Sequence, residues 1–284
     1  MKTAVVTGAT SGIGLAVCEA LAANGVNIIG IGRSAENCRA AREKLSGTYK
    51  GGRHVFFHGD LMQQTEARRI SGEIREHLDK SGGELSALIN NAGCVRSWYM
   101  TTQEGYEQQF ALNHLAGFLL TYELMPYLIR ARGMVLFTSS GSHKGIKLNW
   151  DDLMHQKNYN PLSAYKRSKL CNVLTAYAIN ERFSAEGVSA YAVDPGLVAT
   201  DIGSKDTGKL VELVWKWRKR YGVNPAIPAQ TYLRLFSAQE RPEGLYQGLK
   251  GAKKYSEEVT GANAARLYEV SERLCGVETE EGLL

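Results

Sequence analysis

Short apolar segments alternate with longer amphipathic segments from the first residues of the chain to about residue 200. The apolar segments are four to six residues long, a length typical of strands buried on both faces of a sheet. They lie at residues 3–7, 27–31, 54–58, 87–90, 134–139 and 189–194. The segments with helical spacing lie between them, at residues 13–23, 35–45, 65–78, 103–130 and 163–185. This alternation predicts an α/β fold with a doubly wound parallel sheet, whose strand carboxyl ends share one ligand-binding edge.

The pattern changes in the last third of the chain. Residues 201–222 mix basic side chains with leucine, valine and tryptophan. Beyond them we expect a helix at residues 226–238, a short strand at 245–246 and a final helix at 262–274. This tail is too short to bury a sizeable core of its own, so residues 1–284 are predicted to form a single domain.

Composition narrows the class of protein. Lys and Arg number 34 and Asp and Glu 29, and the formal net charge of +5 is far from the concentrated basic face of a nucleic-acid binder. The five cysteines are scattered without a C-x-x-C pair, so we expect neither a disulfide framework nor a metal site. No apolar run reaches the length of a membrane span, and glycine interrupts the first apolar segment, unlike in a signal peptide. We therefore expect a cytoplasmic protein.

A glycine-rich turn follows the first predicted strand, where residues 7–14 read TGATSGIG. Glycines let the chain turn sharply and let a pyrophosphate approach backbone N–H groups at a helix N-terminus. The spacing is G-x-x-x-G-x-G, and no Lys-Ser or Lys-Thr pair follows, so this is not a P-loop. A tight turn without a ligand is the alternative, but the position at the first strand–helix junction favours cofactor binding. The predicted contacts are Gly8, Thr10, Ser11, Gly12, Ile13 and Gly14.

Polar residues also follow the next three strands. The second strand ends in Gly32 and Arg33, where an NAD-binding protein would place a carboxylate that hydrogen-bonds the ribose. A guanidinium can instead bind a 2′-phosphate, so Arg33 favours NADP(H), with a solvated arginine at a helix start as the alternative. Asp60 can hydrogen-bond an adenine amino group, although Asp, Asn and Gly are also common in plain turns. The predicted contacts after the third and fourth strands are Asp60, Leu61, Asn91, Ala92 and Gly93.

Tyr165 and Lys169 lie early in the helix predicted at residues 163–185, one turn apart and therefore on one face. A free phenol has a pKa of about 10 and is a poor base at neutral pH. A neighbouring ammonium and a positively charged nicotinamide ring favour the phenolate and lower that pKa. A Y-x-x-x-K pattern is common by chance, but Ser140 at the end of the fifth strand and Asn113 in the preceding helix add weight to it.

Taken in order along the chain, these motifs resemble the short-chain dehydrogenase/reductase family, which has a Rossmann fold, and the likeness covers nearly the whole sequence. The glycine turn, the N-N-A-G run at residues 90–93, the helix asparagine, the serine and the Y-x-x-x-K pair all match, as does a P-G-x-x-x-T segment. The resemblance implies a catalytic set of Asn113, Ser140, Tyr165 and Lys169. It implies further cofactor contacts from Tyr165, Lys169, Pro195, Gly196, Val198 and Thr200.

Within that family the chain looks most like the branch of retinol dehydrogenases and related enzymes of lipophilic carbonyls. Its markers include His143 after the serine pair and a spacing of 25 positions between Ser140 and Tyr165. The resemblance implies an NADP(H)-dependent oxidoreductase that transfers a hydride between nicotinamide and a lipophilic ketone or aldehyde, or the matching alcohol, such as a steroid, bile acid or retinoid. Tyr165 would be the general acid and base, Ser140 would hydrogen-bond the carbonyl oxygen, Lys169 would bind the ribose, and Asn113 would hold a water relay.

The family has a variable substrate cap after the P-G motif, which corresponds here to residues 197–225. Tryptophan, leucine and valine residues in this segment imply an apolar cap and a hydrophobic substrate. Basic and aromatic residues at 209–221 are also suited to anionic lipid, but an amphipathic helix packed on the protein is favoured over membrane contact. Cys171 and His143 are interpreted as core residues. The long helices resemble those of family oligomers, which predicts a homodimer or homotetramer.

Two other functions stay open at this point. A non-catalytic NADP-sensing or scaffolding protein can have the same fold, although an intact set of Ser140, Tyr165 and Lys169 argues against it. A sugar-nucleotide epimerase or dehydratase would have a T-G-x-x-G-x-x-G turn and a larger C-terminal region, and the observed spacing disfavours that class.

Overall fold

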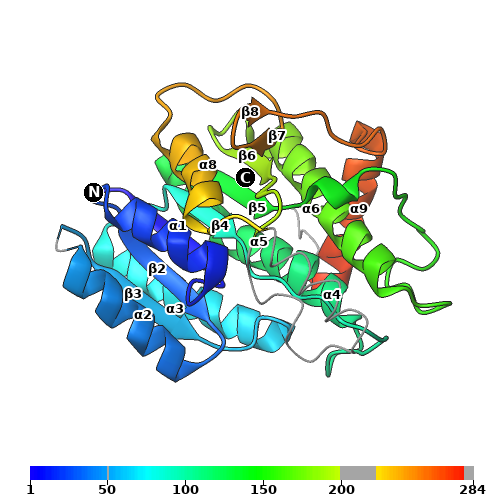
Figure 1. Cartoon of the computed structure of the whole chain (residues 1–284), viewed down its shortest axis with the longest axis horizontal. Helices are drawn as coiled ribbons and strands as arrows, with labels where there is room; N and C mark the ends of the chain where they lie inside the picture. Colours follow the sequence, from blue (N-terminus) through cyan, green and yellow to red (C-terminus); the bar gives the residue numbers. More distant parts are fainter. Residues whose placement is uncertain (50, 199–221, 278–284) are drawn as a thin grey trace.

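The computed structural model describes residues 1–49, 51–198 and 222–277. Within these ranges one sheet crosses the molecule in the order β3-β2-β1-β4-β5-β6-β7-β8, with helices on both faces (Figure 1). The strands are β1 (Thr3–Thr7), β2 (Asn27–Gly32), β3 (His54–His58), β4 (Ala87–Asn90), β5 (Met134–Thr138), β6 (Ser189–Val193), β7 (Tyr246–Gly248) and β8 (Gly251–Ala252). Strand order reverses between β1 and β4, so the predicted doubly wound sheet is confirmed. The short β8 differs from the prediction because it pairs antiparallel with β7.

The helices divide between the two faces of the sheet. On one face lie α1 (Gly12–Ala22), α2 (Ala35–Thr48) and α8 (Ala226–Ser237). On the other lie α3 (Gln64–Ser81), α5 (Ala116–Ala131), α6 (Pro161–Phe183) and α9 (Gly261–Cys275). The two helices and the strand predicted after residue 222 are confirmed as α8, α9 and β7, with small shifts at their ends.

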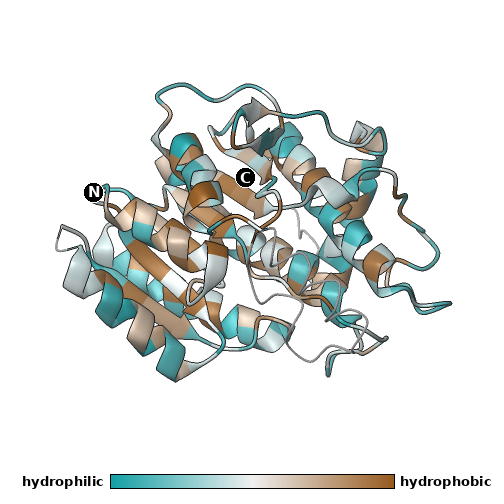
Figure 2. Cartoon of the chain, in the orientation of Figure 1, coloured by the Kyte–Doolittle hydropathy of each residue, from teal (hydrophilic) through white to brown (hydrophobic). Residues whose placement is uncertain are grey.

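Alternate residues of the strands belong to two separate hydrophobic cores, one on each face of the sheet. Val5 and Ile29 pack with α3, α5, α6 and α9, whereas their neighbours Val6 and Ile28 pack with α1 and α8. All four side chains are essentially buried, and each contributes roughly 1.5–3 kcal/mol relative to an exposed position. Figure 2 shows the result, with brown residues along the central strands and teal residues on the outer turns of peripheral helices such as α2. Burial on both faces explains why the strands read as continuous apolar runs.

The helix predicted at residues 103–130 begins later and is not uniform. A loop extends to Glu107, whose side chain accepts the N–H of Phe110 at 2.7 Å and starts the short helix α4 (Gln108–Phe110). A π-helical turn, η1 (Ala111–Leu115), follows before α5 begins. A single π-helical turn inside a helix is uncommon and often marks a functional site. Here it contains the predicted catalytic residue Asn113.

Candidate active site

The glycine-rich turn joins β1 to α1 and leaves a helix end suited to an anion. Gly8 has a φ of +66°, a conformation that residues with a Cβ rarely adopt. A Cβ on Gly14 would stand 2.2 Å from the Gly8 carbonyl oxygen and 2.6 Å from Asn91 Nδ2, so only glycine fits there. The side chain of Ser11, the N-cap residue of α1, accepts no capping hydrogen bond. Without a side-chain cap, the first backbone N–H groups of α1 remain for another acceptor. They lie at the positive end of the helix dipole, which attracts negative charge.

Thr7 ties this turn to the residues that follow β4. Its hydroxyl oxygen accepts the N–H of Asn91 at 2.9 Å and the N–H of Ala92 at 2.8 Å. In return, the Asn91 side-chain amide donates to the Thr7 carbonyl oxygen at 3.0 Å. Two predicted cofactor contacts are thus brought beside the glycine turn. Thr7 itself was not predicted as a site residue, although its position in the motif was visible.

Arg33 is exposed at the end of β2, beside the same turn. A Cβ on Gly32 would stand 2.5 Å from Thr10 Cγ2, so the end of β2 and the glycine turn are in contact. The hydroxyl of Ser34 accepts the N–H of Asn37 at 3.4 Å and caps α2. The structure therefore places the Arg33 backbone beside the glycine turn, and its contact with a 2′-phosphate stays a prediction.

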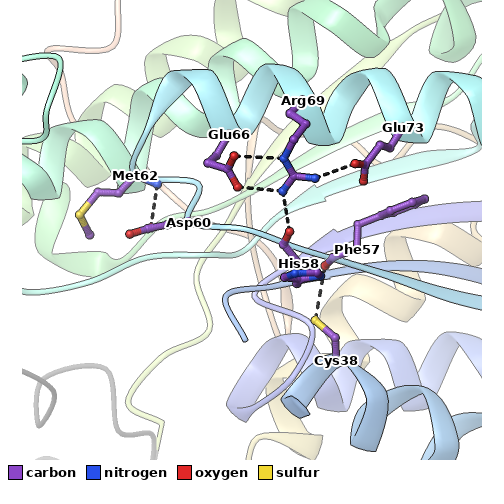
Figure 3. Close-up of polar contacts among 8 residues, drawn as sticks. All are labelled: Cys38, Phe57, His58, Asp60, Met62, Glu66, Arg69 and Glu73. Atoms are coloured by element: carbon purple, nitrogen blue, oxygen red, sulfur yellow. Dashed lines mark hydrogen bonds and ion pairs between the residues drawn. The ribbon is translucent and has the colours of Figure 1, made fainter. Parts of the chain in front are cut away.

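An arginine of α3 holds the loop that follows β3. Figure 3 shows Arg69 donating to the His58 carbonyl oxygen, at 2.8 Å, while it also hydrogen-bonds Glu66. The hydrogen bonds from Arg69 hold the pKa of the Glu66 carboxyl below its ordinary value. Asp60 accepts the backbone N–H two residues further on at 3.1 Å, and Leu61 is buried. The turn chemistry considered as the alternative for Asp60 is therefore present, at the sheet edge where the adenine contact was predicted.

Tyr165 and Lys169 lie on one face of α6, as their spacing predicted. The helix starts at Pro161 behind the N-cap Asn160, whose side chain accepts a backbone N–H at 2.9 Å. Lys169 Nζ stands 5.6 Å from the centre of the Tyr165 ring, and both residues are buried. Burial lowers the pKa of the Lys169 ammonium to about 8. A cation held against the phenol in this way stabilises the phenolate that forms when Tyr165 gives up its proton.

The Lys169 ammonium is oriented by the end of β5. It donates to the carbonyl oxygen of Thr138 at 3.0 Å, and the amide of Asn172 donates to the same oxygen at 3.0 Å. The next residue, Ser139, donates its hydroxyl proton to the Lys169 carbonyl oxygen at 2.8 Å. These contacts fix α6 against the end of β5, two residues before the predicted catalytic Ser140.

Asn113 connects the π-helical turn to both neighbouring segments. Its Oδ1 accepts the N–H of Cys94 at 2.7 Å, and its Nδ2 donates to the Cys94 carbonyl oxygen at 3.0 Å. The same Nδ2 donates to Ser168 Oγ at 3.0 Å. A Cβ on Gly93 would stand 3.0 Å from Asn113 Oδ1 and 3.5 Å from Lys169 Nζ. The predicted residues Gly93, Asn113 and Lys169 therefore meet at one place.

Ser140 begins a 3₁₀ turn, η2 (Gly141–His143), directly after β5. Its Oγ accepts two hydrogen bonds from Ser142, one from the backbone N–H at 3.2 Å and one from the hydroxyl at 3.0 Å. With both acceptor positions used, the hydroxyl proton of Ser140 remains for donation to another oxygen. The role of Ser140 as a donor to a substrate carbonyl oxygen needs such a proton and stays a prediction.

The segment after β6 forms the far side of the site. Asp194 Oδ1 accepts the N–H of Gly196 at 3.0 Å and fixes the turn around Pro195. Asp194 is buried and forms an ion pair with Lys253, which brings the β7–β8 end of the sheet against this turn. Val198 is also buried, and Thr200 lies outside the described residues, as does most of the predicted cap at 197–225.

A cavity of about 510 Å³ opens beside this turn. Apolar side chains predominate along its wall, and several of them are at least one-third exposed. The lining includes Pro195, Leu197, Val223, Ile227, Leu249 and Lys253. The backbone N–H of Val223 donates to the Leu197 carbonyl oxygen at 2.9 Å, so the segments that precede and follow residues 199–221 are in contact.

The described residues hold no group of three His, Cys, Asp or Glu side chains placed to bind a metal ion. All five cysteines are buried free thiols, and Cys171 is a core residue as interpreted. His143 is also fully buried, in agreement with the core interpretation. Among the helices that the structure describes, none has the length and apolar character needed to cross a bilayer.

The fold and the site define a nucleotide-binding α/β protein with a buried Tyr–Lys pair at the ligand edge of its sheet. A family model described as short chain dehydrogenase matches residues 2–210. The chain therefore belongs to the short-chain dehydrogenase family, and the resemblance found in its motifs is confirmed.

Named relatives and solved structures agree with this assignment. Human retinol dehydrogenase 13 is 34% identical, over 98% of this chain and 85% of its own length. Human polyprenol dehydrogenase is 34% identical, over 71% of this chain and 62% of its own length. A crystal structure of an uncharacterized protein from Mycobacterium paratuberculosis superimposes with a TM-score of 0.73 at 26% identity, covering 97% of this chain and 94% of that one. A short-chain dehydrogenase from Sphingobium yanoikuyae in complex with NADPH shares the fold, with a TM-score of 0.63 at 18% identity, over 100% and 98%.

Proposed function

We propose that the protein is an NADP(H)-dependent oxidoreductase that interconverts a lipophilic ketone or aldehyde and the matching alcohol. Family membership supports the oxidoreductase class. The observation that carries the proposal is the buried Lys169 ammonium, held 5.6 Å from the centre of the Tyr165 ring at the edge of the sheet where the glycine turn opens. Such a pair has little use in a purely structural core, because burying a cation without a matching charge is costly.

The residues of the glycine turn fit a dinucleotide. The close contact of Gly14 with the Gly8 carbonyl oxygen keeps the turn tight, and the N-terminus of α1, which has no side-chain cap, provides N–H donors for a pyrophosphate. Arg33 is exposed where β2 meets this turn, and we assign it to the 2′-phosphate that distinguishes NADP(H) from NAD(H). Lys169 would bind the nicotinamide ribose. When bound, NADPH supplies the hydride that reduces the carbonyl carbon.

The chain's own residues would supply the proton and the polar contacts. Ser140 donates a hydrogen bond to the substrate oxygen through the proton that its own contacts with Ser142 leave available. Tyr165 transfers its hydroxyl proton to the same oxygen during reduction and removes it during oxidation. The Lys169 ammonium stabilises the resulting phenolate. With a pKa of about 8, most Lys169 side chains are protonated at pH 7, so burial reduces the charged fraction only slightly.

The cavity beside Pro195 supports a lipophilic substrate. Its wall is mainly apolar, with Leu197, Val223, Ile227 and Leu249 among the lining residues. Exposed apolar side chains around a concave site are typical of a pocket for an apolar ligand. The names of the relatives point the same way, because retinol and polyprenol are both hydrophobic alcohols.

The test replaces Tyr165 with phenylalanine. Tyr165→Phe keeps the ring beside the ammonium and removes only the hydroxyl, so we expect NADPH affinity within about twofold and turnover lower by at least ~10²-fold, the lower end of the range for a general acid. Affinity is measured by NADPH fluorescence, and turnover by NADPH oxidation with retinal, a polyprenal, a steroid ketone and a small polar ketone.

Tyr177→Phe on the same helix is the matched control, and it should leave both quantities unchanged. Turnover of Tyr165→Phe within a factor of two of the unmodified protein would remove Tyr165 from the reaction. Faster turnover of the small polar ketone than of every apolar substrate would overturn the assignment of substrate class.

A further inference from the structure

The buried imidazole of His143 joins the catalytic serine turn to a distant part of the chain. The Ser140 carbonyl oxygen lies 3.1 Å from the backbone N–H donor of His143 and 2.7 Å from its ring Nδ1. On the other side of the ring, the backbone N–H of Ser256 donates to Nε2 at 3.2 Å. The histidine is fully buried, so water does not compete for these contacts.

The partners of the ring fix its protonation state. The Ser256 N–H can only donate, so Nε2 must present its lone pair, and the Ser140 carbonyl can only accept, so Nδ1 must carry the proton. A protonated Nε2 would face another donor across 3.2 Å. Burial also lowers the pKa of the imidazole, against the opposing hydrogen bond to the Ser140 carbonyl. His143 is therefore a neutral ring with one donor and one acceptor, both in use.

The ring is also held by packing. Tyr246 of β7 meets it edge-on, with ring centres 4.7 Å apart and an angle of 71° between the planes. Lys253, which pairs with Asp194, has its ammonium 5.9 Å from the centre of the Tyr246 ring. The histidine thus stands between the serine turn and the C-terminal segment that carries β7, β8 and Ser256. Its orientation is determined by both.

We propose that His143 is a positioning residue for Ser140, acting through the Ser140 carbonyl, and that its contact with Ser256 holds the ring in the tautomer that donates to this carbonyl. This inference rests on the proposed function. The carbonyl of Ser140 accepts both hydrogen bonds from one residue, which fixes the peptide plane and therefore the direction of the Cα–Cβ bond. The hydroxyl then has a single direction in which its proton remains for donation.

An apolar side chain of the same volume would fill the space without the cost of burying two polar atoms. The choice of an imidazole therefore needs a reason besides packing. Orienting Ser140 provides one, because displacing a reacting group by about 1 Å can reduce turnover by ~10²-fold.

Two substitutions separate the ring nitrogens. In His143→Asn the amide nitrogen can occupy the place of Nδ1 and keep the donor to Ser140, while the contact with Ser256 is lost. In His143→Gln the longer side chain can keep an acceptor for Ser256 at the place of Nε2, while the donor to Ser140 is lost. Each variant loses one buried hydrogen bond, so both should lose similar thermal stability. Only turnover is expected to distinguish them.

We expect His143→Asn to retain kcat within about threefold and His143→Gln to lose at least ~10-fold, with the dissociation constant for NADPH unchanged in both. His143→Leu, which removes both contacts, should resemble the Gln variant. Equal kcat for the Asn and Gln variants, or full kcat for the Leu variant, would overturn the positioning role while leaving the oxidoreductase proposal intact.

A measurement without turnover separates the two proposals further. The ¹⁵N chemical shifts of the His143 ring in the full-length protein should show a protonated Nδ1 and an unprotonated Nε2. The opposite tautomer would refute the inference even if no substrate were turned over. Failure of the reaction in the unmodified protein, together with the expected tautomer, would instead count against the proposed function alone.

Discussion

His114 offers a sharp test of how the core responds to pH. It lies in the π-helical turn η1, is fully buried, and places Nε2 2.8 Å from Ser271 Oγ of α9. Ser271 donates its own proton to the Leu267 carbonyl oxygen at 2.7 Å, so the histidine must donate through Nε2. Its other nitrogen, Nδ1, has no hydrogen-bond partner among the described residues. Protonation would therefore place an unpaired charge in the core, and burial lowers the pKa of His114 to about 3.

The sign and size of the effect follow from the two pKa values. An unfolded histidine has a pKa of about 6.5, so between about pH 6.5 and pH 3 the unfolded chain binds more protons than the folded chain. The free energy of unfolding must then fall as the pH falls, by ~1.4 kcal/mol per pH unit, and the contribution of His114 is fully present only above pH 6.5. At pH 5 the loss amounts to roughly 2 kcal/mol.

The perturbation is His114→Gln, which can keep a donor at the place of Nε2 and cannot titrate in this range. Urea unfolding of both proteins at pH 7.5 gives the cost of the substitution itself, and repetition at pH 5 gives the pH effect. Every other titrating group is shared, so the unmodified protein should lose about 2 kcal/mol more than the variant between these pH values. Equal losses, to within about 0.5 kcal/mol, would refute the assignment of a neutral, unprotonated core histidine.

Two further predictions concern the cofactor. Gly14→Ala should weaken NADPH binding at least ~10-fold, because the new Cβ would stand 2.2 Å from the Gly8 carbonyl oxygen and displace the turn. Gly47→Ala is the control, because a Cβ there meets nothing within 4 Å. An unchanged dissociation constant for Gly14→Ala would contradict the placement of the pyrophosphate. Arg33→Ala should weaken NADPH at least ~10-fold more than NADH in a fluorescence titration, whereas equal losses would remove the 2′-phosphate assignment.

The sequence predicted the strands well because the central strands are buried on both faces, and continuous apolar runs are then hard to mistake. The prediction of a helix was wrong over residues 103–107, which form a loop. The amphipathic spacing continues backwards from α4 into a loop, where Gly105 takes a φ of +86° and the buried Glu107 caps the next helix. Gly105 was the available signal. The π-helical turn at Ala111–Leu115 could not be predicted from a hydrophobic pattern, because the chain is buried on nearly all sides here and has no apolar stripe whose phase an extra residue would shift.

In the site, the sequence could predict the functional side chains but not the backbone groups that orient them. Spacing placed Tyr165 and Lys169 on one helix face, and their motif named them. The acceptor that orients the ammonium, however, is the Thr138 backbone carbonyl oxygen. Every residue has such an oxygen, so no residue type in the sequence could identify it. Thr7 differs, because its hydroxyl binds the backbone after β4 and its place in the glycine motif was a usable signal.

The family motifs and the apolar cavity lie in different parts of the chain. The match to the family model covers residues 2–210, which include the glycine turn, Ser140, Tyr165 and Lys169. Much of the apolar cavity wall, from Val223 to Lys253, lies beyond that match, and so does Ser256. The part of the chain that lines this cavity also carries Ser256, whose N–H fixes the His143 tautomer proposed to orient Ser140. A change in that segment that withdraws the Ser256 N–H should therefore alter kcat as well as KM, because the His143 tautomer is then no longer fixed. A segment that only provides binding area would alter KM alone.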